Sequence, residues 1–227
     1  MKSISLTMIA IAMMMFAAHG QHKQHGGNEA NKYMHKRSFE ELTERFEDKS
    51  RDQWQKPEQV IALMGDIKGK TVVDLGAGTG YFAFKLADHG AKVIAADVDD
   101  DFQNFIKVKK EELKFNDDQI SLKKIPFDSP ELVAGQTDVV LIVNTYHHIE
   151  DRVPYFKEIL DGLTDDGYLM NVDFIKKEFK ESVPGPPMAH RISKEQVIEE
   201  LKKSGFARFE VDTDLLPFQY VIRAYRK

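Results

Sequence analysis

The stretch that decides the fold is Thr71–Gly80, which reads T-V-V-D-L-G-A-G-T-G. Val72 and Val73 are β-branched and apolar, which favours a buried strand, and Asp74 ends that strand. Glycine then occupies every second position, at Gly76, Gly78 and Gly80. Because these positions have no side chain, the main chain can lie directly against a ligand. The segment Tyr81–Ala87 resumes with helical spacing, so the sequence predicts a strand, a bare turn and a helix N-terminus in succession.

The spacing of the glycines indicates which kind of ligand this turn binds. A dinucleotide fingerprint, G-x-G-x-x-G, would place its third glycine where this chain has Tyr81. The chain instead reads D-x-G-x-G-x-G, a tighter pattern that begins with an acid. A nearby carboxylate repels a diphosphate, whereas it attracts a ligand that carries an ammonium or sulfonium group. The pattern therefore favours a cationic ligand beside Asp74 over a dinucleotide.

This stretch resembles motif I of the class I S-adenosylmethionine (SAM)-dependent methyltransferases, and the resemblance covers roughly residues 39–227. A second acid, Asp97, ends the next expected strand, Lys92–Val98. The resemblance places Asp97 at the cofactor ribose, where a carboxylate can accept two hydrogen bonds from the vicinal diol. It implies SAM as the cofactor and the following cofactor-binding residues: Trp54, Asp74, Gly76, Ala77, Gly78, Gly80, Tyr81, Asp97, Val98, Phe127, Asp128 and Asn144. In this family the loop after the third strand lines the adenine, which makes Ile125, Phe127 and Asp128 the candidates for that contact.

Two helical segments are expected ahead of the glycine turn. Apolar residues at helical spacing predict the first over residues 38–49, with Ser38 and Glu41 as a capping box, and Pro57 suits the first turn of the second. The motif R-F-E-x-x-x-R-x-x-W-Q-K-P resembles the segment before motif I in a group of small, often exported bacterial methyltransferases of unassigned substrate. In related enzymes such helices cover the cofactor, and Trp54 is either part of that cover or a packing residue.

A second group of candidate residues follows the apolar run Thr137–Asn144, which predicts a central strand buried on both faces. Tyr146, His147 and His148 come directly after it, at the edge where open α/β sheets bind their ligands. A histidine here can act as a general base, and an aromatic ring stabilises a nearby sulfonium. Because the two histidines are adjacent, we expect one to face the ligand and the other to pack behind the sheet. All three are candidate catalytic residues, and a scaffold role is the alternative.

The rest of the chain completes the expected fold. Gly167–Phe174 is predicted as the fifth strand, and 206–216 and 218–225 as an antiparallel pair that closes the sheet. The intervening loop, 175–191, is long and is expected to form a lid on the substrate side, with three candidate contacts at Met188, His190 and Arg191. The predicted architecture is a doubly wound, seven-stranded and mostly parallel sheet of the Rossmann-like class I methyltransferase type, with an N-terminal helical cover.

The N-terminus is predicted to lie outside this domain. Residues 1–20 combine an early lysine, an apolar run and small residues before Gln21, which is typical of a secretory signal peptide. An uncleaved membrane anchor is the alternative, so membrane contact is expected only through this segment. Residues 21–37 are polar and predict a disordered linker, and 38–227 form the methyltransferase domain. The sequence thus predicts an exported protein, periplasmic or secreted.

Composition limits the chemistry. The chain has no cysteine, which excludes disulfides, cysteine zinc sites and thiol nucleophiles, and no metal site is expected. The net charge of −5 argues against a nucleic-acid substrate, since such surfaces are usually basic. The resemblance therefore implies methyl transfer from SAM to a small-molecule nucleophile. The alternatives are an exported binding protein that keeps the fold without turnover, and a nicotinamide-dependent oxidoreductase.

Overall fold

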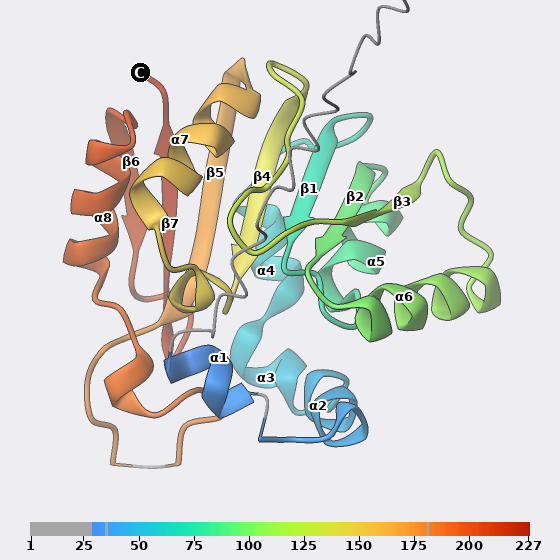
Figure 1. Ribbon diagram of the computed structural model, residues 1–227, viewed down its shortest axis with the longest axis horizontal. Helices are drawn as coiled ribbons and strands as arrows, with labels where there is room; N and C mark the ends of the chain where they lie inside the picture. The colour runs from blue at the N-terminus through green and yellow to red at the C-terminus, as the bar shows by residue number, and fades with distance from the viewer. Residues whose placement is uncertain (1–28, 35, 181) are drawn as a thin grey trace, which may run out of the picture.

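The computed structural model describes residues 29–34, 36–180 and 182–227, which form one seven-stranded sheet with helices on both faces (Figure 1). The strand order is β3-β2-β1-β4-β5-β7-β6. The strands are β1 (Thr71–Leu75), β2 (Lys92–Asp97), β3 (Ile120–Lys124), β4 (Thr137–Val143), β5 (Leu163–Phe174), β6 (Arg208–Asp212) and β7 (Gln219–Tyr225). All neighbours pair in parallel except β7, which is antiparallel to β5 and β6. The predicted mostly parallel, seven-stranded sheet is confirmed.

The helices form the two outer layers. One face of the sheet is covered by α4 (Pro57–Ala62), α5 (Tyr81–Asp88) and α6 (Asp100–Glu112), and the other by α7 (Arg152–Gly162) and α8 (Lys194–Lys203). Successive side chains of a strand point to opposite faces, so Val72 of β1 packs under the first layer and Val73 under the second. Helices on both faces also explain why β4 is apolar along almost its whole length.

Three short helices, α1 (Glu29–Met34), α2 (Phe39–Phe46) and α3 (Arg51–Gln55), lie across the carboxyl ends of the parallel strands (Figure 1). The expected capping box begins α2: the Ser38 hydroxyl accepts a hydrogen bond from the Glu41 amide at 3.2 Å, and the Glu41 carboxylate accepts one from the Ser38 amide at 3.0 Å. These helices form the predicted N-terminal cover.

The prediction of a disordered linker over 21–37 is wrong for α1. Ala30 and Asn31 in this helix are buried, and the Asn31 amide is hydrogen-bonded to His148. This polar segment is ordered by contacts with residues over a hundred positions away, which local composition does not reveal. The predicted signal peptide, 1–20, and the linker residues 21–28 lie outside the described residues and stay predictions. In the part of the chain that is described, no helix is both long and apolar enough to cross a membrane.

Helix α6 differs from the expected pattern. The apolar spacing predicts a helix over residues 101–115 with four residues facing inward, Phe102, Phe105, Val108 and Leu113. Phe102 is buried and Ile106 one turn later is fully buried, whereas Val108 and Leu113 are 57% and 52% exposed. The helix begins at Asp100, so its buried stripe follows the i, i+4 spacing from Phe102 to Ile106 and leaves Val108 on the outer side.

Candidate functional site

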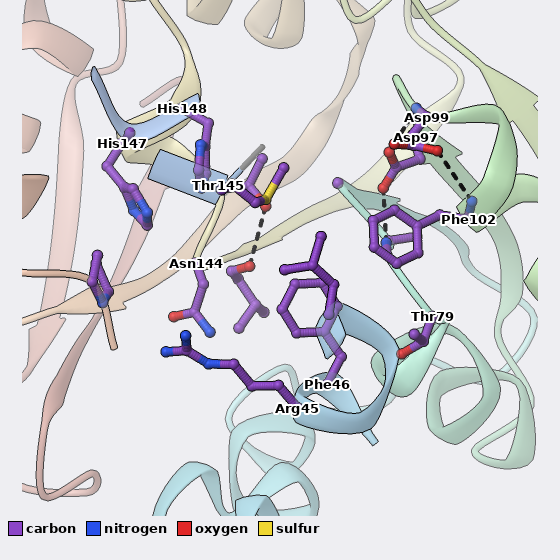
Figure 2. A pocket seen from close by; sticks show the side chains of 18 of the residues that line it. Arg45, Phe46, Thr79, Asp97, Asp99, Phe102, Asn144, Thr145, His147 and His148 are labelled. Carbon is purple, nitrogen blue, oxygen red and sulfur yellow. Dashed lines mark hydrogen bonds between the residues drawn. The ribbon is translucent and has the colours of Figure 1, made fainter. Parts of the chain in front are cut away.

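The described residues enclose a cavity of about 380 Å³ between the carboxyl ends of the strands and the N-terminal helices (Figure 2). This volume lies within the range of small-molecule binding sites. The predicted site residues that line it are Trp54, Gly76, Ala77, Gly78, Asp97, Val98, Phe127, Asn144, His147 and His148, and Ile125 lines it too. The predicted site residues that do not line it are Asp74, Gly80, Tyr81, Asp128 and Tyr146.

The glycine turn lies against two neighbouring segments. Gly76 has a φ of 77°, and a Cβ atom there would lie 2.4 Å from the Thr145 hydroxyl oxygen, so only glycine allows this close approach. Gly78 has a φ of 54°, and its amide donates a hydrogen bond of 2.8 Å to the Asp97 carboxylate. The turn therefore keeps its main chain bare toward the cavity while its two sides are anchored to the ends of β2 and β4.

Asp97 lies at the end of β2, as the sequence predicts. One carboxylate oxygen accepts the Gly78 amide and the other accepts the Asp99 amide at 3.0 Å, and burial raises the pKa of this group. Each oxygen has a second lone pair, so the carboxylate can still accept hydrogen bonds from a diol. Phe102, which stacks on Phe46 with ring centroids 5.6 Å apart, gives this end of the cavity apolar walls (Figure 2).

Asp74 and Tyr81 flank the glycine turn in the sequence, and neither lines the cavity. The Asp74 carboxyl is buried, and its Oδ2 atom has no hydrogen-bond partner among the described residues. The Tyr81 hydroxyl is hydrogen-bonded to Asp52, and the Arg51 guanidinium lies 3.9 Å from the centre of the Tyr81 ring. Neither Asp74 nor Tyr81 reaches the cavity, so a direct cofactor contact does not fit this geometry. Asp128 is exposed and borders a smaller hollow beside Phe127.

Asp74 should make stability depend on pH. Burial raises the pKa of Asp74 from 3.8 to about 7, with Arg51 opposing the rise. A carboxyl whose pKa is higher in the folded state contributes stability that is full below pH 4 and is lost as the pH rises toward 7. Between pH 4 and 7 we expect the free energy of unfolding of Asp74→Asn to decrease less than that of wild type, by on the order of 3 kcal/mol. Urea unfolding at pH 4, 5, 6 and 7 measures it, and equal slopes for both proteins would contradict it.

A chain of side-chain amides fixes the orientation of Asn144, which has a φ of 57° at the end of β4. Arg51 can only donate, and its Nε donates to the Gln55 oxygen at 2.6 Å. Gln55 then donates to Gln219 at 3.0 Å, and Gln219 donates to the Asn144 oxygen at 2.6 Å. In this row of hydrogen bonds each side-chain oxygen accepts from the preceding residue. The Asn144 amide nitrogen therefore remains as a donor beside the cavity.

The two histidines lie in a 3-10 turn, η1 (Tyr146–His148), and both line the cavity with ring centroids 4.3 Å apart. His147 Nδ1 lies 2.9 Å from the Asp173 carboxylate, and both side chains are buried. His148 Nδ1 lies 2.7 Å from the Asn31 oxygen, while the Asn31 nitrogen donates to the His148 carbonyl. Both rings therefore carry the Nδ1 proton, which makes Nε2 the nitrogen that can accept another.

The sequence analysis did not identify Asp173 or Asn31. Asp173 is the penultimate residue of β5, so the rule that ligands bind at the carboxyl ends of parallel strands points to it. Asn31 has no such signal, because it belongs to the segment that composition indicates as a linker.

The prediction that one histidine packs behind the sheet is wrong. Both histidines line the cavity, and Tyr146 is the residue of this turn that packs away from it. Its ring is fully buried and stacks on Phe156, and its hydroxyl donates to Glu200 at 2.6 Å. In a 3-10 turn neighbouring side chains diverge by about 120°, so two consecutive residues can face one side and the third the other. A role for Tyr146 at the reacting atoms does not fit this position.

The Tyr146→Phe variant tests this correction. We expect it to lower the free energy of unfolding by about 1–2 kcal/mol, because the buried hydrogen bond to Glu200 is lost, and to leave cofactor affinity unchanged. Chemical unfolding and calorimetric titration measure the two quantities. A large loss of cofactor affinity without destabilisation would show that Tyr146 contributes to the binding site.

The expected substrate-side contacts on the loop 175–191 do not line the cavity. Arg191 is buried, and its guanidinium donates to the carbonyls of Pro186, Ile175 and Lys177, which ties the loop to itself. Met188 and His190 belong to the outer turn η2 (Met188–His190). The loop meets the cavity instead through three residues, Pro184, Gly185 and Pro186.

Comparison with known proteins finds similarity to methyltransferases. Residues 73–169 match the family model described as a methyltransferase domain. The match begins in β1 and ends in β5. An uncharacterized methyltransferase of Staphylococcus carnosus is 32% identical over 131 residues, 56% of this chain and 58% of that protein. A demethylmenaquinone methyltransferase of Lactococcus lactis is 30% identical over 131 residues, 55% of this chain and 49% of that protein. The matched segment thus spans about half the length of the curated relatives.

Solved structures share the fold of this chain. A SAM-dependent methyltransferase from Aquifex aeolicus superposes with a TM-score of 0.72 at 22% identity, over 83% of this chain and 98% of that one. The fold is therefore that of the class I, SAM-dependent methyltransferases, and SAM is the cofactor against which the site can be tested. The residues fit it: the bare turn at Gly76 and Gly78 admits close approach, Asp97 suits the ribose, and Phe102 and Ile125 offer apolar surface. Within the described ranges, no group of His, Asp and Glu has the arrangement of a metal site.

Proposed function

We propose that this protein binds SAM and transfers its methyl group to a small-molecule nucleophile. One observation carries the proposal: a single cavity contains the bare glycine turn and Asp97 at one end and His147 with His148 at the other. When bound, SAM supplies a methyl group on an already activated sulfonium. The main contribution of the protein is then to hold donor and acceptor in contact.

In this proposal different residues bind the cofactor, accept the proton and cover the cavity. Gly76, Gly78 and Asp97 hold the cofactor, and the Asn144 amide nitrogen donates a hydrogen bond from the end of β4. His147 Nε2 takes the proton of a hydroxyl, amine or enol nucleophile, and the Asp173 carboxylate holds the imidazole in the tautomer that allows it. The N-terminal helices cover the cavity and exclude water. The acidic net charge supports a small acceptor over a nucleic acid.

A binding titration and a methylation assay test the proposal. S-adenosylhomocysteine (SAH) should bind the purified protein with a 1:1 stoichiometry, and NADH should not displace it. Radiolabelled SAM should then methylate members of a panel of small hydroxyl, amine and enol compounds. Failure to bind SAH, or its displacement by NADH, would refute the proposal. SAH binding without any product would favour a binding protein that has kept the fold.

A further inference from the structure

Two arginines line the cavity, and neither has an acidic partner in the part of the chain that the structure describes. Arg45 extends from α2 into the cavity toward Asn144 (Figure 2), and Arg37 precedes α2. Over residues 29–34, 36–180 and 182–227, neither guanidinium makes a salt bridge. Two positive charges thus border one small enclosed volume.

The partners of both arginines are neutral. Arg45 Nη2 donates to the Pro184 carbonyl at 2.5 Å and to the Gly185 carbonyl at 3.4 Å, and its Nε and Nη1 groups have no acceptor among the described residues. Arg37 donates to the Tyr33 hydroxyl at 3.2 Å and lies 4.9 Å from the centre of that ring. Burial and then the Arg37 charge lower the pKa of Arg45, and the hydrogen bond from Arg37 lowers the pKa of Tyr33. Both shifts are those expected where positive charge lacks a counter-ion.

The acids that line the same cavity have other partners. Asp97 and Asp99 lie at the end of β2 and accept backbone amides of the turn and of α6. Asp48 is at the rim and accepts the Ser50 amide at 2.7 Å. An anion from outside the chain is therefore the natural partner of the arginine pair, because guanidinium groups bind carboxylate and phosphate through paired hydrogen bonds.

We propose that Arg45, assisted by Arg37, binds an acid group of the methyl acceptor. The acceptor is then a small molecule that carries a carboxylate or phosphate and an apolar body, because Trp54 and Phe174 wall the same cavity. This inference rests on the proposed methyl transfer. The acid group anchors the acceptor at the arginines and leaves its nucleophile beside His147.

The carboxylate of the cofactor's amino-acid tail is a second possible source of negative charge. The position of Arg45 favours the acceptor, because its hydrogen bond to Pro184 joins it to the loop 175–191. That loop follows β5 and borders the cavity on the side away from the Asp97 end of the sheet.

The test measures the binding of small acids to protein saturated with SAH. Benzoate, phenyl phosphate and neutral benzamide are titrated calorimetrically into wild type, Arg45→Gln, Arg45→Lys and Arg208→Gln. Arg208 is a matched control, since it is an exposed arginine on β6, paired with Glu210. We expect wild type to prefer the two acids over benzamide, Arg45→Gln to bind them about 10-fold more weakly, Arg45→Lys to be intermediate and Arg208→Gln to match wild type.

Equal affinity of wild type and Arg45→Gln for the acids, or no preference for acids over benzamide, would overturn the inference. A second arm compares SAH with 5′-methylthioadenosine, which lacks the amino-acid tail. Arg45→Gln should bind both as wild type does, and a selective loss of about 10-fold for SAH would assign the arginine to the cofactor and overturn the inference. Failure of the proposed function is a different result, because wild type would then not bind SAH at all.

Discussion

Alanine in place of Gly76 is expected to weaken SAH binding by roughly 100-fold and to destabilise the fold by about 2–4 kcal/mol. The added Cβ would lie 2.4 Å from Oγ1 of Thr145 and 2.6 Å from its Cγ2, far inside contact distance. Either the glycine turn moves off the end of β4, or Thr145 moves and displaces the turn η1 that follows it. Both responses alter the cavity, and the φ of 77° adds strain for any residue with a side chain.

Calorimetric titration with SAH and urea unfolding measure the two effects, and the chain contains its own controls. Gly65 and Gly69 also have positive φ values, of 75° and 74°, but a Cβ there meets nothing within 4 Å. Alanine at either position should therefore show only the backbone strain, with SAH affinity unchanged. Thr145→Ala removes the two closest atoms and should partly rescue Gly76→Ala. Wild-type affinity in Gly76→Ala would show that the turn does not hold the cofactor.

The sequence predicts well those parts of the fold that depend on residues close together in the chain. The apolar runs of β1, β2 and β4 identify strands buried on both faces, and the alternating glycines identify the turn. The position of Asp97 in the site also follows from local order, because the carboxyl ends of adjacent parallel strands meet at one edge of the sheet. Neither inference needs knowledge of the packing around it.

The parts that the sequence misses depend on packing between distant segments. Helix α1 carries too few apolar residues to predict a helix, and it is held by the contact between Asn31 and His148. Arg191, which was expected at the substrate, binds carbonyls of its own loop, whereas Arg45, for which the sequence predicted no role, lines the cavity. Nothing in their immediate neighbours distinguishes them, because the side that each faces is set by the tertiary fold.

The His147→Ala variant should lower turnover by about 10²–10⁴-fold and leave SAH affinity unchanged, if the nucleophile must lose a proton. The physical reason is that Nδ1 faces Asp173 at 2.9 Å, which leaves Nε2 to accept the proton. Turnover with the best acceptor of the panel measures the effect. Tyr146→Phe is the control from the same turn, since its side chain lies outside the cavity. Full turnover in His147→Ala together with a loss in His148→Ala would assign the base to His148.

The positioning role of Asp173 has a test that does not need an acceptor. The Phe174 amide donates to Asp173 Oδ1 at 2.7 Å, so in Asp173→Asn the side-chain oxygen is expected to keep that bond. The new NH₂ group then faces His147 Nδ1, which must become an acceptor, and the ring proton moves to Nε2. The ¹⁵N chemical shifts of the His147 ring should report this exchange of tautomers at neutral pH, and turnover should fall with the fold intact. Unchanged ring shifts would show that Asp173 does not set the tautomer, whatever happens to the rate.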